Sequence, residues 1–230
     1  RSALRAIEGV ADGITDAVES GAGRLVIGAI PTMSPYLLPR VISRLRADYP
    51  DCELVVHEDL TERLLERLDD ASIDIALLSP PIDHPRIEVE HLGSERLLVV
   101  APEDDGSLPA AEVTLSQLRA FPRISLSEIH CLGTQIESFC TRRDLTRQVA
   151  CHATQLDTVF ELVRLGLGVS LVPAMALRGR RRDGLKYFRL RRESPRRAIG
   201  VATKAGRSRS LLADRAAAIL ESEVRDLGGA

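Results

Sequence analysis

The stretch SEIHCLGTQIESFC, residues 127–140, contains the side chains of this sequence that are most suited to redox chemistry. His130 directly precedes Cys131, and Cys140 follows nine residues later. A thiolate can be oxidised to a sulfenic acid, and a second thiol can then condense with that acid to form a disulfide. A histidine beside the first thiol can stabilise its thiolate by a hydrogen bond or a positive charge. These residue types fit a redox pair, and they also fit two ordinary structural cysteines.

The spacing of the apolar side chains predicts that this stretch is a helix. Its buried stripe, at positions i, i+4, i+7 and i+8, consists of Leu132, Ile136, Phe139 and Cys140. The apolar run RISLS, residues 123–127, is typical of a strand that ends just before the helix. Cys131 is therefore expected at the helix N-terminus, where the dipole would lower the pKa of its thiol. Cys140 is expected on the buried face, where it would be inert.

A disulfide between these cysteines is incompatible with an intact helix. Nine residues of α-helix span about 13–14 Å, whereas bonded cysteines hold their Cα atoms roughly 4.4–6.8 Å apart. A bond between Cys131 and Cys140 would require the helix to unravel, so it would act as a conformational switch. The alternative, which the spacing alone favours, is a capping thiol and a core thiol that never meet. A zinc site is a further alternative, although no standard spacing joins its candidate ligands, His130, Cys131, Cys140, Cys151 and His152.

The composition is that of an ordinary globular protein. Of the 230 residues, 44% are hydrophobic and 28% are charged, with a formal net charge of −2, so the chain as a whole is not built to attract nucleic acid. No apolar run reaches the roughly 20 residues that span a bilayer, and we expect no membrane association. Four cysteines are too few for a disulfide scaffold, so we expect a cytoplasmic protein with reduced thiols, no metal and no cofactor. Cys52 and Cys151 lie in expected strands and are interpreted as structural.

The first twenty residues predict a helix with a coiled-coil seam. Apolar side chains alternate at intervals of three and four residues, at Leu4, Ile7, Ala11, Ile14 and Val18. Gly21 and Gly23 then end the pattern. Because the chain begins with Arg1 rather than methionine, residues 1–20 are interpreted as the end of a linker or dimerisation helix of a longer protein. An amphipathic helix packed on its own domain is the alternative.

Beyond these residues, strands alternate with helices. Strands are expected at 24–30, 52–58, 73–79, 87–93, 96–102, 123–127, 148–153, 168–173, 185–190 and 198–203. Further helices are expected at 36–48, 61–70, 114–120, 156–165 and 208–227. Such alternation is typical of an α/β fold with a mostly parallel sheet and helices on both faces. The strands are too many for one compact sheet, so we expect two α/β halves with a crossover near 94–101.

The loop PTMSPYLLP, residues 31–39, follows the first expected strand and precedes a helix. Its hydroxyls, on Thr32 and Ser34, lie where ligands bind in open α/β sheets. Free amides at the start of the helix would favour an anion or a polar small molecule. The same hydroxyls could equally cap the helix.

Two stretches resemble a known family. GRLVIGAIPTMSPYLLPRVISRLRADYPDCELVVHED, residues 23–59, resembles the start of the effector-binding domain of LysR-type transcriptional regulators. HCLGTQIESFC, residues 130–140, resembles the hydrogen-peroxide-sensing branch of that family, as do residues 153–177, 181–190 and 194–201. The resemblance implies two Rossmann-like subdomains, similar to type 2 periplasmic binding proteins. Subdomain I would comprise 21–95 and 200–230, and subdomain II, with the redox cysteines, would comprise 96–199.

The resemblance also implies roles for individual residues. Cys131 would be the peroxide-reactive thiol, Cys140 its disulfide partner, and His130 the histidine beside it. Thr32 and Thr61 would surround the peroxide, and Arg197 would lie beside the thiol, where a positive charge helps to hold a thiolate.

This sequence departs from the family pattern directly after the reactive cysteine. Gly133 and Thr134 stand where the best-known members of the branch have a charged pair. The Thr134 hydroxyl remains available to hydrogen-bond, so Thr134 is expected to join Thr32, Thr61 and Arg197 in binding the peroxide. Gly133 costs about 1 kcal/mol of helix stability relative to alanine, which would ease unravelling or shift the start of the helix.

The partners implied by the resemblance are hydrogen peroxide and a second copy of the chain. A homodimer or homotetramer would form through the subdomains and the linker helix, while promoter DNA and RNA polymerase would be contacted by the full-length regulator. The chain would be a regulator and not an enzyme. The alternatives are a domain that binds a small organic effector between its subdomains, with incidental cysteines, and a thiol peroxidase.

Overall fold

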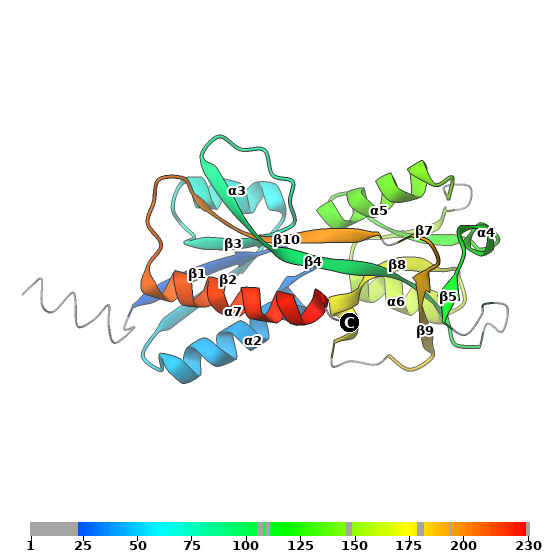
Figure 1. Ribbon diagram of the computed structural model, residues 1–230, viewed down its shortest axis with the longest axis horizontal. Helices are drawn as coiled ribbons and strands as arrows, with labels where there is room; N and C mark the ends of the chain where they lie inside the picture. The colour runs from blue at the N-terminus through cyan, green and yellow to red at the C-terminus, as the bar shows by residue number, and fades with distance from the viewer. Residues whose placement is uncertain are drawn as a thin grey trace, which may run out of the picture.

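The computed structural model describes residues 23–104, 108, 111–145, 149–178, 182–193 and 195–228. Figure 1 shows two lobes side by side, joined by long strands that run from one lobe into the other. The helix expected over 1–20 lies outside the described residues.

The first lobe is built on three parallel strands. They are β1 (Arg24–Ala29), β2 (Glu53–Glu58) and β3 (Ile75–Leu78), with β1 in the centre. Three helices cover them: α2 (Ser34–Asp48), α3 (Thr61–Asp69) and α7 (Leu211–Gly228). In Figure 1, α3 lies on one side of the strands and α2 and α7 lie together on the other. This arrangement places the carboxyl ends of β1 and β3 toward the second lobe.

The second lobe has shorter elements. Its strands are β5 (Glu112–Val113), β6 (Arg123–Leu126), β7 (Val149–Ala153), β8 (Ser170–Pro173) and β9 (Leu185–Leu190). Its helices are α4 (Leu115–Leu118), α5 (Cys131–Arg142), α6 (Leu156–Arg164) and the 3₁₀ helix η1 (Ala174–Leu177). β6 and β7 form a separate parallel pair. The sequence prediction missed β5 and η1, because both are too short to show a period.

Two long strands, β4 (Ile87–Pro102) and β10 (Arg196–Lys204), join the lobes. The expected break of β4 into two strands is wrong, because the chain continues through Gly93 in one strand of 16 residues. Gly93 has φ +152°, and a Cβ there would lie 2.8 Å from Val224 of α7. The glycine therefore lets the strand pass closely beneath the helix without interruption.

The expected mostly parallel sheet is also wrong. The main sheet runs β2-β1-β3-β10-β4-β9-β5, with β8 also paired to β4. β10 is antiparallel to β3 and β4, and β4 is antiparallel to β8 and β9. Strand runs that are buried on both faces look alike in either direction, so the sequence alone did not reveal the mixture. The α/β fold class itself is confirmed.

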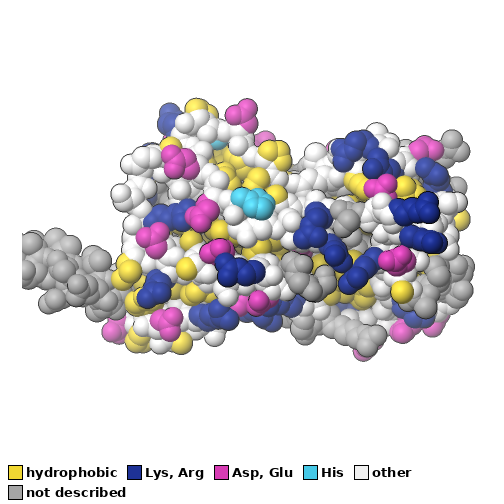
Figure 2. All heavy atoms as spheres, in the orientation of Figure 1, with side chains coloured by type: hydrophobic (Ala, Val, Ile, Leu, Met, Phe, Trp, Pro, Cys, Tyr) yellow, Lys and Arg dark blue, Asp and Glu magenta, His cyan; other side chains and the backbone are white. Residues whose placement is uncertain are grey.

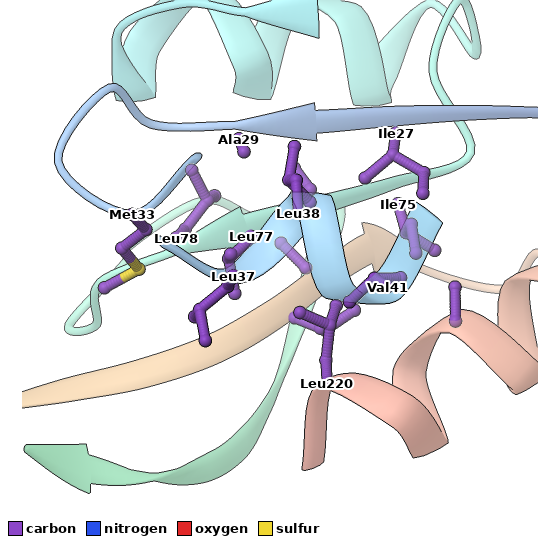
Figure 3. Packing of buried hydrophobic residues seen from close by; sticks show 14 of the residues in the cluster. Ile27, Ala29, Met33, Leu37, Leu38, Val41, Ile75, Leu77, Leu78 and Leu220 are labelled. Atoms are coloured by element: carbon purple, nitrogen blue, oxygen red, sulfur yellow. The ribbon is translucent and has the colours of Figure 1, made fainter. Parts of the chain in front are cut away.

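Each lobe has its own hydrophobic core. Figure 3 shows the core of the first lobe, where side chains of β1, α2, β3 and α7 interlock; among them are Ile27, Leu37, Leu38, Val41, Ile75, Leu77 and Leu220. The core of the second lobe includes the buried face of α5. Met175 of η1 packs into the core of the first lobe, although its neighbours in the chain belong to the second. The boundaries given above for the subdomains stay a prediction.

Within the part of the chain that the structure covers, no helix is long and apolar enough to cross a bilayer.

Candidate functional site

The predicted helix is confirmed as α5, and Cys131 is its first residue. His130 is the N-cap, with extended backbone angles of φ −96° and ψ 134°. The preceding strand β6 ends at Leu126, so a short loop carries the chain to the helix. The backbone amides of Cys131 and Leu132, at the start of the helix, act on the Cys131 thiol.

Gly133 fixes how closely α5 approaches the end of β6. A Cβ at this position would lie 2.1 Å from the carbonyl oxygen of Ser127 and 2.8 Å from that of Leu126. No larger residue fits without moving backbone. The helix begins two residues before Gly133, at Cys131. Close packing explains the glycine here.

A narrow pocket gathers four of the predicted site residues. Thr32, Thr61, His130 and Cys131 line it, together with Ile30, Pro31, Leu60 and Ile129. Thr32 follows β1 and Thr61 begins α3, so the first lobe supplies both hydroxyls and the second lobe supplies the thiol. Hydrogen bonding by the Thr61 side chain acts to lower the pKa of the Cys131 thiol. The pocket thus has a half-buried thiol facing polar groups from the opposite lobe.

Arg197 lies behind this pocket and is only 1% exposed. Its Nη1 donates to Thr32 Oγ1 at 2.9 Å, and its Nη2 donates to the Thr32 carbonyl at 2.8 Å. Because the Thr32 oxygen accepts from Arg197, its own proton is free to be donated into the pocket.

Glu95 balances the buried charge of Arg197 and was not anticipated from the sequence. The Arg197 Nε donates to Glu95 Oε1 at 2.6 Å, and the other carboxylate oxygen accepts from the Met175 amide at 2.8 Å. Both side chains of the ion pair are fully buried. The cross-strand register of β4 with β10 sets the two residues opposite one another, and no signal in the sequence gives that register.

The Cys131 thiol does not have the lowered pKa that its helix position suggested. Burial raises the pKa of Cys131, and this effect exceeds the opposing effects of the Arg197 charge, the Thr61 hydrogen bond and the backbone amides. The prediction of a lowered pKa is therefore wrong, because desolvation outweighs the helix terminus here. The resting thiol is mostly protonated near neutral pH, while the surrounding donors stabilise a thiolate once it forms.

His130 is held by the second lobe. Its Nε2 lies 2.7 Å from the carbonyl oxygen of Thr154, at the end of β7. A carbonyl only accepts, so Nε2 carries the proton in this contact. In the neutral ring, Nδ1 remains as the acceptor nitrogen.

Cys140 lies at the far end of the same helix and is completely buried. Burial raises the pKa of its thiol to about 11, with the charge of Arg123 opposing the shift and that of Glu137 adding to it. The nine-residue separation from Cys131 corresponds to roughly 13–14 Å along the axis. Cys52, Cys131, Cys140 and Cys151 are all free thiols in this structure.

Thr134 lies outside the narrow pocket. Its hydroxyl donates to the carbonyl oxygen of Glu128 at 3.1 Å and so closes the loop before α5. It lines a second pocket that also touches Cys131.

Two further contacts hold α5 in place, and sequence reasoning missed both. Gln135 Nε2 donates to Ser79 Oγ of the first lobe at 3.1 Å. Glu137 pairs with Arg123 of β6 at 2.8 Å. Each depends on residues far away in the sequence. No group of three or more His, Cys, Asp or Glu side chains in the described ranges is arranged to hold a metal ion.

A wider cleft of about 460 Å³ opens beside the narrow pocket. It is lined by both lobes, with Thr32, Tyr36 and Glu58 on one side and His130, Gln155 and Asp157 on the other.

The chain belongs to the LysR substrate-binding domain family, which it matches over residues 19–225. Among curated proteins, it is 31% identical over 207 residues to the DNA-binding transcriptional dual regulator OxyR of Escherichia coli K12, covering 90% of this chain and 68% of that protein. It is 34% identical over 209 residues to a probable hydrogen peroxide-inducible genes activator of Streptomyces viridosporus, covering 89% of this chain and 67% of that protein.

Solved structures of OxyR proteins share the fold. A cysteine mutant of Corynebacterium glutamicum OxyR superposes with a TM-score of 0.83 at 32% identity, covering 99% of this chain and 73% of that one. The reduced OxyR regulatory domain of Pseudomonas aeruginosa gives a TM-score of 0.75 at 25% identity, covering 89% and 98%. The resemblance to the peroxide-sensing branch of the LysR family, and the fold similar to type 2 periplasmic binding proteins, are confirmed.

Proposed function

We propose that this chain is the peroxide-sensing regulatory domain of a transcriptional regulator, in which hydrogen peroxide oxidises Cys131 and Cys140 then forms a disulfide with it. The observation that carries the proposal is the narrow pocket, where the Cys131 thiol meets hydroxyls of the other lobe with Arg197 behind them. Relatives named as hydrogen peroxide-inducible genes activators also support a peroxide-sensing function.

The first step is attack of the Cys131 thiolate on one peroxide oxygen. The O–O bond breaks, the sulfur becomes a sulfenic acid, and the other oxygen leaves as hydroxide and takes up the thiol proton to form water. Hydrogen bonding by the Thr61 side chain steadies the thiolate. Thr32 has a free proton to donate to the leaving oxygen, and the buried guanidinium of Arg197 strengthens that donor.

The second step is attack of the Cys140 thiolate on the sulfenic sulfur. The S–S bond forms, the S–O bond breaks, and the hydroxide that leaves takes up the proton lost by the Cys140 thiol to form water. The helical separation of roughly 13–14 Å is about twice the longest Cα–Cα distance that a disulfide allows, so α5 has to open. Opening breaks the contacts of Gln135 with Ser79 and of Glu137 with Arg123. Once exposed, Cys140 loses the desolvation that holds its pKa near 11, and its thiol becomes a better nucleophile.

The output of the switch is a changed assembly. Refolding of residues 130–141 alters the surface of the second lobe, and homodimers or homotetramers formed through the subdomains and the helix predicted over 1–20 repack. In the full-length cytoplasmic regulator, that movement reorients the domains that contact promoter DNA and RNA polymerase. Because Cys140 is reached only after α5 opens, we propose a slow switch and not a turnover enzyme.

Mapping of thiols and disulfides by mass spectrometry after one equivalent of peroxide tests this proposal. The wild-type chain should yield a 131–140 crosslink, and Cys140→Ser should stop at a sulfenic acid that dimedone traps on Cys131. Cys131→Ser should yield neither product, and Cys151→Ser serves as the matched control that behaves like wild type. Persistence of both thiols in the wild-type chain would contradict the mechanism.

The wide cleft favours a second candidate function, the binding of a small organic effector between the lobes. It is roomy and lined by polar groups of both lobes. A metabolite that raises the melting temperature equally in wild type and Cys131→Ser, combined with no crosslink after peroxide, would favour this candidate.

A further inference from the structure

A second pocket borders Cys131 and has no part in the peroxide chemistry described above. It has a volume of about 660 Å³, and Cys131 is the one residue that it shares with the narrow pocket. It shares no lining residue with the wide cleft. One wall comes from α5, and the other comes from residues after β3, on β4 and at the start of β10: Ser79, Pro81, Leu97, Pro195 and Arg196.

The α5 wall is one continuous face of the helix. Cys131, Gln135, Ser138 and Arg142 follow one another at intervals of four, three and four residues. The pocket therefore exists in this form only while α5 is helical from end to end.

The charge of the pocket suits an anion. Arg142 and Arg196 line it, and no acidic residue does. Arg142 donates to Ser138 Oγ at 2.5 Å and Arg196 donates to Ser94 Oγ at 2.9 Å, but neither guanidinium forms an ion pair with any acidic side chain of the described residues. Figure 2 shows Lys and Arg side chains gathered over the second lobe and the joint between the lobes.

The remaining polar and apolar groups narrow the class of ligand. The Gln135 Oε1 oxygen is buried and accepts no hydrogen bond. A ligand that carries a hydrogen-bond donor would supply the missing partner. Pro81, Leu97 and Phe139 add apolar surface. A small organic acid with an apolar body and one hydrogen-bond donor meets all three features.

We propose that this pocket binds a small organic carboxylate and that the bound ligand holds α5 in its helical form, so that it opposes disulfide formation. The carboxylate is bound by Arg142 and Arg196. The role in regulation rests on the proposed peroxide switch, whereas the binding site does not. A ligand that binds only the helical form, at ten times its dissociation constant, reduces the population of open α5 about elevenfold.

The test uses 4-hydroxybenzoate as the probe, because it carries a carboxylate, an apolar ring and a hydroxyl donor, with neutral 4-hydroxybenzamide as the matched compound. Calorimetric titration of the reduced protein should show binding of the acid but not of the amide. Arg142→Gln and Arg196→Gln should each weaken binding roughly tenfold, since each removes one charge-assisted contact. Both arginines are exposed, so the variants should fold. Arg189→Gln, an exposed change on β9 away from the pocket, should bind like wild type.

A kinetic arm separates the inference from the peroxide mechanism. With the probe at ten times its dissociation constant, formation of the 131–140 crosslink after peroxide should slow roughly tenfold, and Arg142→Gln should remove most of this effect at the same probe concentration. Absence of binding, unchanged binding in both arginine variants, or an unchanged crosslinking rate in bound protein would overturn the inference. No crosslink without the probe would instead overturn the peroxide mechanism, and the titration would still decide whether the pocket binds the acid.

Discussion

At the scale of single residues, the site depends on a buried ion pair that the sequence did not reveal. Arg197 was expected beside the thiol from family resemblance, whereas Glu95 fell in the short turn expected between the strands 87–93 and 96–102. The two lie 102 positions apart and meet through the register of β4 and β10. A single sequence does not specify that register, so the counter-ion of Arg197 could not be predicted. The pair fixes the guanidinium that holds Thr32.

Removing Arg197 should destabilise the fold as well as the site. Arg197→Met leaves Glu95 buried without its partner, and we expect a loss of about 3–5 kcal/mol in the free energy of unfolding, measured by urea denaturation. Adding Glu95→Gln should recover part of the loss, because it removes the unpaired charge. Arg24→Met is the control, since its 3.4 Å ion pair with Glu53 is exposed and should contribute less than about 1 kcal/mol. A loss no larger than that of the control would contradict this role of Arg197.

The raised pKa of Cys131 predicts how its oxidation depends on pH. The thiolate is the nucleophile, so the rate should rise with pH, and burial places that rise above the range of an ordinary thiol. Thr61→Val removes the hydrogen bonding of the Thr61 side chain and should raise the pKa of Cys131 further. We expect the midpoint of the rate profile to move up by about one pH unit, the equivalent of one charge-assisted hydrogen bond.

The rate profile is measured by stopped-flow or quenched labelling of Cys131 across neutral and alkaline pH. Thr141→Val, an exposed change on the same helix, should leave the midpoint in place. A midpoint that is equal in Thr61→Val and wild type would show that the Thr61 hydroxyl does not act on the sulfur.

At the scale of elements, α5 was predicted correctly because its apolar residues repeat at helical spacing and its two cysteines mark the segment as a candidate site. The neighbouring strands were predicted less well. A short turn was expected at Ser94 and Glu95, yet β4 runs through them, and α7 packs directly against the preceding Gly93. Gly133 was interpreted through helix propensity, whereas its contact with the Ser127 carbonyl decides its role. At both positions, a close contact decides the role of the glycine: with Val224 of α7 at Gly93, and with the Ser127 carbonyl across the loop at Gly133. The neighbouring residues in the sequence do not indicate these contacts.

Replacing Gly133 should therefore destabilise the reduced form. Gly133→Ala gains about 1 kcal/mol of helix propensity but forces a Cβ onto backbone, and overpacking costs typically about 1–3 kcal/mol. We expect a net loss in the free energy of unfolding and faster formation of the 131–140 crosslink, because the helical state is the one that is strained.

The measurement is urea denaturation of the reduced protein, paired with timed alkylation after peroxide. Thr141→Ala, at an exposed position of the same helix, should be neutral or stabilising. A stabilised Gly133→Ala protein would mean that helix propensity outweighs the close contact.

At the scale of the whole molecule, α5 contacts both lobes, so unfolding of this helix changes contacts in each of them. It belongs to the core of the second lobe and reaches Ser79 of the first through Gln135. The fold class followed from the alternation of elements, but the joining of the lobes by β4 and β10 did not, since it depends on pairings between distant strands. Opening α5 releases a contact between lobes as well as one within a lobe.

Oxidation should therefore change the assembly of the chain. We expect light scattering after size-exclusion chromatography to give a different mass distribution for reduced and peroxide-treated protein at equal concentration. Cys140→Ser should keep the reduced distribution after peroxide, because its α5 stays closed. Equal distributions for reduced and crosslinked wild-type protein would contradict a switch that acts through assembly.

The central claim is that α5 opens when the two cysteines join, and hydrogen–deuterium exchange of the peptide covering residues 131–142 tests it most directly. In reduced protein, these amides should exchange slowly, because they are helical and partly buried. After one equivalent of peroxide, exchange in this peptide should become fast, while the peptides of β1 and β3 stay protected. A crosslinked protein whose 131–142 amides remain as protected as in the reduced form would contradict the account.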